Sequence, residues 1–149
     1  MNTKLPVIET KRLILREIKL SDCNDMFEYA SIPWFGPMAG WQPHRTVGET
    51  KSIIQLFIDK KKYGQLGTYA VILKEENKMI GTLELHTYMR GFKAELGYSI
   101  NPRYQGKGYA TEAAIEAIIW GFEDLGLARI ECTTYTHNFS SQKVCEKLH

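Results

Sequence analysis

The sequence lacks a long hydrophobic run, a strong excess of one charge and any internal repeat. Lysines and arginines number 19 against 17 aspartates and glutamates, and the net charge of +2 indicates no basic surface of the kind that binds nucleic acid. No stretch approaches the ~20 apolar residues of a membrane-spanning helix, and the N-terminus has no apolar segment typical of a secretory signal. We therefore expect a cytoplasmic protein without nucleic-acid or membrane partners.

Cysteine is also scarce. Cys23, Cys132 and Cys145 are odd in number and widely spaced, which predicts neither a disulfide framework nor a zinc site, and we expect no metal. Hydrophobic residues make up 44% of the 149 positions. This is enough to bury one core, so residues 1–149 are predicted to form a single domain.

The first part of the chain predicts one strand and two helices. Residues 10–18 alternate charged and aliphatic side chains, as in a strand. One helix is expected to begin at Ser21, which would cap it, and another at Thr46, in a capping box with Glu49. The segment 31–45 between them is rich in proline, glycine and aromatic residues and is expected to be irregular.

The second part of the chain begins with three strand-like runs joined by short polar turns, which predicts an antiparallel meander. They span 68–73, 79–87 and 92–100. A helix over 108–125, a strand over 129–136 and a helix from about 138 follow. The order β-α-α-β-β-β-α-β-α indicates an α/β protein built on one mixed sheet.

The most informative segment is a glycine-containing loop that runs into an apolar helix. Gly106 and Gly108 can adopt positive φ, so backbone N–H groups can converge on one anion, beside the unpaired amides of the first helical turn. This arrangement predicts a diphosphate site. A P-loop is excluded because Lys107 lies between the glycines and Tyr109 replaces the magnesium-binding hydroxyl. A dinucleotide-binding loop is excluded as well, because Thr111 stands where such a loop has its third small residue and because the loop should come early in a parallel βαβ unit.

Several motifs resemble one protein family. The spacing Gln105-x-x-Gly108-x-Ala110 is similar to the loop that holds the acetyl-CoA pyrophosphate in the Gcn5-related N-acetyltransferases (GNAT). Other segments resemble the RimJ/RimL branch of this family, in the same order and over most of the chain. They are T-K-R-L-I-L-R at 10–16, I-G at 80–81, A-E-L-G-Y at 94–98 and N-F-S-S-Q-K-V-C-E-K-L at 138–148.

The resemblance implies a GNAT fold, splayed between its fourth and fifth strands, and an acetyl-CoA-dependent N-acetyltransferase. The acceptor would be a primary amine, either a protein N-terminus, such as that of a ribosomal protein, or a small amine. Attack would be direct, within a ternary complex. The residues expected to hold acetyl-CoA are Tyr98, Ser99, Ile100, Gln105, Gly106, Lys107, Gly108, Tyr109, Ala110, Asn138 and Ser141.

Catalysis requires a base, because an alkyl ammonium has a pKa of about 10 and an N-terminal amine about 8. Glu95 is the candidate base, close to where relatives place a glutamate, and Glu84 on the neighbouring strand is the second choice. The alternative role for Glu95 is a pairing with a lysine or an amide in the sheet.

Catalysis also requires an acid for the departing thiolate. Many family members place a tyrosine seven residues after the helix-opening asparagine, and Cys145 stands there in this sequence. Ser141 therefore becomes the first candidate for the proton donor. Cys145 follows, with burial as a small hydrophobe as its alternative role, and Tyr135 is a further donor.

The acceptor side has its own candidates. Trp34, Trp41 and His44 lie in the irregular loop that covers the acceptor in relatives, and they are expected either to bind the amine, together with Glu84, or to pack in the core.

The last residues depart from the family pattern. Where that pattern continues into a final hairpin, the sequence ends at His149. A sheet without this hairpin would expose an edge and favour a homodimer. The rival function is a CoA-binding or regulatory module of the same fold with weak activity or none.

Overall fold

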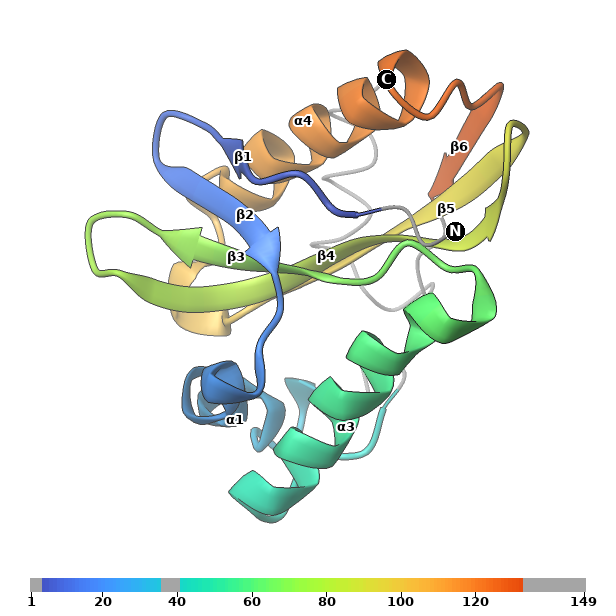
Figure 1. Cartoon of the computed structure of the whole chain (residues 1–149). Coiled ribbons are helices and arrows are strands. Elements are labelled where there is room, and N and C mark those ends of the chain that lie inside the picture. Colours follow the sequence, from blue (N-terminus) through green and yellow to red (C-terminus); the bar gives the residue numbers. More distant parts are fainter. Residues whose placement is uncertain (1–3, 36–40, 133–149) are drawn as a thin grey trace.

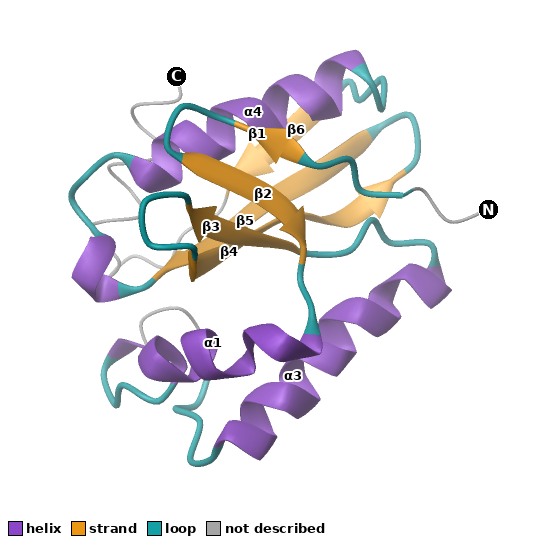
Figure 2. Ribbon diagram, turned by 60° about the vertical axis from the view of Figure 1, so that its left-hand side comes forward, coloured by secondary structure: helices purple, strands orange, loops and turns teal. Residues whose placement is uncertain are grey.

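The computed structural model describes residues 4–35 and 41–132. One curved sheet separates α4 on one face from α1 and α3 on the other (Figures 1 and 2). The strands are β1 Ile8–Glu9, β2 Leu13–Glu17, β3 Tyr69–Leu73, β4 Lys78–Met89, β5 Lys93–Ile100 and β6 Arg129–Cys132. The helices are α1 Cys23–Ala30, α3 Val47–Asp59 and α4 Tyr109–Glu123, and short 3-10 turns cover 20–22, 60–63 and 102–104.

The six strands lie in sequence order across the sheet. Every neighbouring pair from β1 to β5 is antiparallel, whereas β5 and β6 are parallel, because α4 carries the chain back between them. Within the described residues, β6 pairs with β5 only from Lys93 to Leu96. The remainder of β5, 97–100, is therefore paired on its β4 side alone in this part of the chain.

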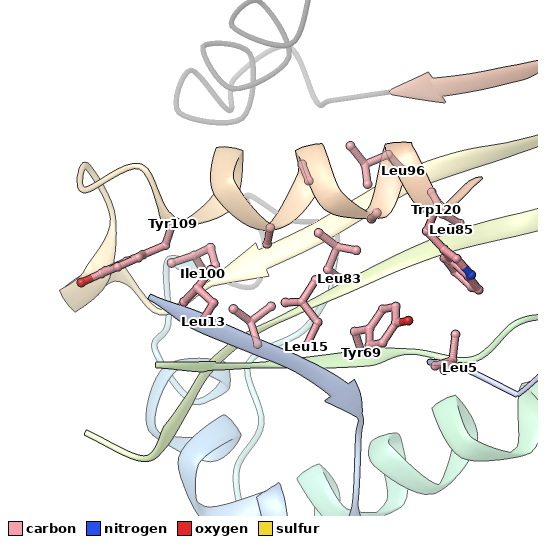
Figure 3. Packing of buried hydrophobic residues seen from close by; sticks show 14 of the residues in the cluster. Leu5, Leu13, Leu15, Tyr69, Leu83, Leu85, Leu96, Ile100, Tyr109 and Trp120 are labelled. Atoms are coloured by element: carbon pink, nitrogen blue, oxygen red, sulfur yellow. The ribbon is translucent and has the colours of Figure 1, made fainter. Parts of the chain in front are cut away.

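The larger core fills the space between the sheet and α4 (Figure 3). Leu83 and Leu96 point from the sheet toward α4, and Trp120 closes the far end against Tyr69. The contact face of α4 carries alanines, among them fully buried Ala117, whose small side chains let the helix lie close to the strands.

A second core lies under the opposite face of the sheet. It joins α1 and α3 to the strands through Met26, Tyr29, Ile54 and Met79, which are at most 1% exposed. The two helices therefore form one layer that covers the face of the sheet on which Tyr29 reaches β5.

The predicted meander and the helix after the glycine loop are confirmed, with bounds that differ by at most two residues. The strand β1 was not predicted, since two residues are too few for a periodic pattern. Thr46 caps α3 as predicted, because its hydroxyl accepts the Glu49 N–H at 3.1 Å. Ser21 does not cap α1: it lies inside the 3-10 turn, whose geometry is set by the Asp22 carboxylate accepting from Lys19 N at 2.8 Å.

Within residues 4–35 and 41–132, no helix is long and apolar enough to cross a membrane. The predicted end of the last strand and the final helix lie outside the described residues and stay predictions.

Candidate functional site

The loop between β5 and α4 has the backbone that the glycines predict. Gly106 and Gly108 have φ of +79° and +83°, in the left-handed region that favours glycine. Gln105 anchors the entry to the loop, because its Nε2 donates to the Ile100 carbonyl at 3.0 Å. The α4 helix begins at Tyr109, directly after Gly108. The amides of its first turn and the positive end of its dipole therefore lie at the loop.

The space and charge around this loop suit an anion. A Cβ built on Gly106 would meet no atom within 4 Å, so the loop opens to free space there. Lys107, between the glycines, is exposed and can add positive charge. The residues present therefore fit a diphosphate group.

A contact that the sequence did not predict ties this loop to the start of the chain. Arg12, in the turn between β1 and β2, donates from Nη1 to the Lys107 carbonyl at 2.9 Å. Its Nε and its backbone N donate to the two oxygens of Glu112 at 2.7 and 3.0 Å, and the Thr10 hydroxyl donates to the same carboxylate at 2.6 Å. Burial alone would raise the pKa of Glu112, but these hydrogen bonds and the guanidinium charge lower it.

Along residues 98–100, where the pantetheine arm is predicted to lie, the side chains of Ser99 and Ile100 are buried. Ser99 is buried, and its hydroxyl lies 3.2 Å from the Tyr29 hydroxyl and 2.7 Å from Thr82 Oγ1. Ile100 is buried in the larger core. Burial raises the pKa of Tyr29, so this hydroxyl stays neutral and contributes to a fixed polar network under β5.

Glu95 lies opposite a histidine. It is the cross-strand neighbour of His86, with Oε2 3.6 Å from Nδ1 of that ring, and the two side chains are 32% and 37% exposed. Gly97 leaves room for the ring, since a Cβ there would lie 3.0 Å from His86 Cδ2. Glu95 thus lies beside an imidazole, whose Nδ1 is 2.9 Å from the Thr87 hydroxyl. His86 was not predicted, because only the strand register brings the two residues together.

Glu84, the second candidate base, is already engaged. It lies on the same face of the sheet as Glu95, by strand alternation. Its Oε2 is 2.9 Å from Lys60 Nζ and accepts from the Thr68 hydroxyl at 3.1 Å. The paired ammonium offsets its charge, which leaves Glu95 as the more available carboxylate of the two.

The aromatic loop residues divide into two groups. His44 is buried, with Nδ1 2.8 Å from Thr50 Oγ1, and its backbone N–H donates to the Ala30 carbonyl, so it joins the loop to α1 and α3. Burial lowers the pKa of His44. Trp41 packs against the Phe35 ring at 5.7 Å. Trp34, in contrast, is 57% exposed.

The remaining predicted residues, Tyr135, Asn138, Ser141 and Cys145, lie outside the described residues. Cys132, at the end of β6, is disulfide-bonded, a single bond that the wide spacing of the cysteines did not predict. In the part of the chain that the structure describes, no group of three or more acidic, cysteine or histidine side chains could hold a metal ion.

Comparisons with known proteins agree on one family. A family model described as an acetyltransferase (GNAT) domain matches residues 12–149. An uncharacterised N-acetyltransferase of Bacillus subtilis, YnaD, is 33% identical over 141 residues, which are 95% of this chain and 80% of that protein.

Two solved structures are similar over nearly the whole chain. A GNAT-family acetyltransferase from Bacillus anthracis has a TM-score of 0.82 at 29% identity, covering 96% of this chain and 82% of that one. The ribosomal-protein-S5-alanine acetyltransferase from Vibrio fischeri has a TM-score of 0.72 at 26% identity, covering 96% and 81%.

Proposed function

Since the chain belongs to the GNAT acetyltransferase family and is an N-acetyltransferase, we propose that it transfers the acetyl group of acetyl-CoA to a primary amine by direct attack within a ternary complex. The observation that carries the proposal is the loop from Gln105 to Ala110. There two left-handed glycines and a helix N-terminus come together at an open, positively charged position.

Acetyl-CoA would be held at the C-terminal end of β5 and the loop that follows it. The amides of the loop and of the first turn of α4 bind the diphosphate, and Lys107 adds charge. The pantetheine arm lies along 98–100, where it pairs with the β5 backbone as an added strand does. Asn138 and Ser141 contribute from the last predicted helix. Bound in this way, acetyl-CoA supplies a thioester whose carbonyl carbon accepts the amine.

Glu95 acts as the base. It takes one proton from the acceptor ammonium, through a water, so that the neutral amine can attack the thioester carbonyl carbon. The carbon–sulfur bond breaks as the amide bond forms, and the thiolate takes a proton from Ser141 or Cys145. The second proton, which the nitrogen loses on forming the amide, returns to that group. His86, next to Glu95, offers a second site for the proton removed from the amine.

The acceptor lies on the face of the sheet that carries Glu84 and Glu95. The Glu95 carboxylate attracts a positively charged amine, whereas the charge of neighbouring Glu84 is offset by Lys60. Exposed Trp34 provides an apolar surface on the side of α1. A protein N-terminus is the first acceptor to test, because the similar Vibrio fischeri enzyme carries a ribosomal-protein acetyltransferase name. Small amines are the second class.

Thiol release from acetyl-CoA tests the proposal directly. The purified chain is mixed with acetyl-CoA and, in parallel, with peptides that begin in alanine or serine and with a panel of polyamines, amino acids and aminoglycosides. We expect amine-dependent thiol release and a mass increase of one acetyl group on an acceptor. Calorimetry with CoA and with adenosine diphosphate should show binding of both. Tight CoA binding without acetylation of any amine would instead favour a binding or regulatory module.

A further inference from the structure

We propose that Arg12 is a positioning residue for the phosphate loop, which rests on the function proposed above. Arg12 lies about 95 residues before this loop and belongs to no helix or strand of the site. Its turn lies beside the start of α4, where the contacts to Lys107 and Glu112 join the two segments (Figure 1).

The first step of the argument is the direction of one peptide group. The described residues contain no cis peptide bond, and in a trans peptide the carbonyl and the following N–H point in opposite directions. Because Arg12 Nη1 holds the Lys107 carbonyl, the Gly108 N–H points away from Arg12. The guanidinium therefore occupies one side of the loop and directs this amide to the other side, where the diphosphate would bind.

The second step is the rigidity of the guanidinium. Glu112 accepts from the Arg12 Nε at 2.7 Å and from its backbone N at 3.0 Å, and Thr10 Oγ1 adds a third bond to the same carboxylate. The flat face of Arg12 stacks on the Tyr109 ring at 4.3 Å. With one edge and one face held, the Nη1 position is determined, and so is the carbonyl that it binds.

The third step concerns charge. Glu112 lies in the first turn of α4, close to the proposed anion site, and an unpaired carboxylate there would repel a phosphate. The ion pair with Arg12 neutralises it. A lysine would also neutralise the charge. Its single ammonium, however, cannot bond both Glu112 and the Lys107 carbonyl and also stack on the Tyr109 ring. Arg12→Lys therefore separates positioning from charge.

The experiment compares Arg12→Ala, Arg12→Lys and wild type by CoA calorimetry and steady-state kinetics. We expect both variants to raise the CoA Kd and the acetyl-CoA KM about tenfold, a 1.4 kcal/mol change, with kcat and the acceptor KM within twofold of wild type. Lys11→Ala is the matched control: it removes the same charge from the neighbouring exposed residue and should behave as wild type.

Several results would overturn the inference. These are wild-type CoA affinity in either Arg12 variant, or a lowered kcat with unchanged acetyl-CoA KM. If Arg12→Ala does not fold, Arg12→Lys alone decides. Failure of wild type to bind CoA would contradict the proposed function instead, so CoA binding by wild type is measured before that of any variant.

Discussion

Replacement of Gly108 by alanine tests whether the left-handed start of α4 binds the phosphate. An L-residue at φ +83° is strained by about 1–2 kcal/mol, and the lower entropy of the unfolded chain offsets about 0.4–1 kcal/mol of this. The free energy of unfolding should therefore fall by roughly 1 kcal/mol, which lowers Tm by about 2–4 °C for a chain of this length.

Gly64 provides a matched control for this strain. Its φ is +80°, and a Cβ there would meet no atom within 4 Å, whereas a Cβ on Gly108 would lie 3.4 Å from Arg12 Nη2. Gly64→Ala and Gly108→Ala should thus lower Tm to a similar extent. Only in Gly108→Ala does the strained residue lie at the proposed phosphate site. If the loop amides turn to relieve the strain there, the diphosphate loses a charge-assisted hydrogen bond of about 1.5–3 kcal/mol.

The assay is calorimetry with CoA at 25 °C, together with thermal unfolding of both variants. Gly108→Ala should raise the CoA Kd about tenfold or more, and Gly64→Ala should leave it within twofold. Equal CoA affinity in the two variants, despite equal losses of Tm, would refute the assignment of the phosphate to this loop.

Three further predictions concern the acceptor face and the second core. Glu95→Gln should lower kcat about 10²–10³-fold with unchanged CoA affinity. The loss of kcat should shrink as pH rises toward the amine pKa, because less of the acceptor is then an ammonium that needs a base. Exposed Glu123→Gln is the control, and an equal loss of kcat at every pH would contradict Glu95 as the base. Gly97→Ala should push the His86 ring away from Glu95, since the added Cβ would lie 3.0 Å from His86 Cδ2. We expect kcat to fall several-fold with little change in Tm, and an unaltered kcat would show that catalysis does not depend on His86 lying beside Glu95. Burial lowers the pKa of His44 below its ordinary 6.5, so the unfolded chain binds the proton more readily than the folded one. The contribution of His44 to the free energy of unfolding should therefore be complete above about pH 6.5 and be lost as pH decreases. Thermal unfolding from pH 8 to 5 should show a smaller fall of Tm in His44→Gln than in wild type, and identical falls would contradict the lowered pKa of His44.

Much of the fold was predictable because its signals are local. Alternating apolar residues predicted the strands of the meander, and Thr46 with Glu49 predicted the start of α3. The comparisons confirm the expected GNAT fold. Ser21 failed as a cap because it lies inside a 3-10 turn that runs directly into α1, and the Asp22 carboxylate in that turn accepts from Lys19 N.

The candidate site was predictable where backbone conformation alone defines it. Two glycines before an apolar helix require left-handed residues at a helix N-terminus, and Gly106 and Gly108 adopt them. The partner of Glu95 was not predictable, since a shift of one residue in the register of β4 would place His86 on the opposite face of the sheet.

The sequence by itself determined the glycine loop, the apolar helix that follows it and the family to which the chain belongs, because each of these depends on residues close together in the chain. Only the tertiary structure decided that Arg12 holds that loop, that His86 faces Glu95 and that the Lys60 ammonium engages Glu84. Those contacts join residues 9 to 95 positions apart, and they exist only after the strands have found their register and α4 has packed on the sheet.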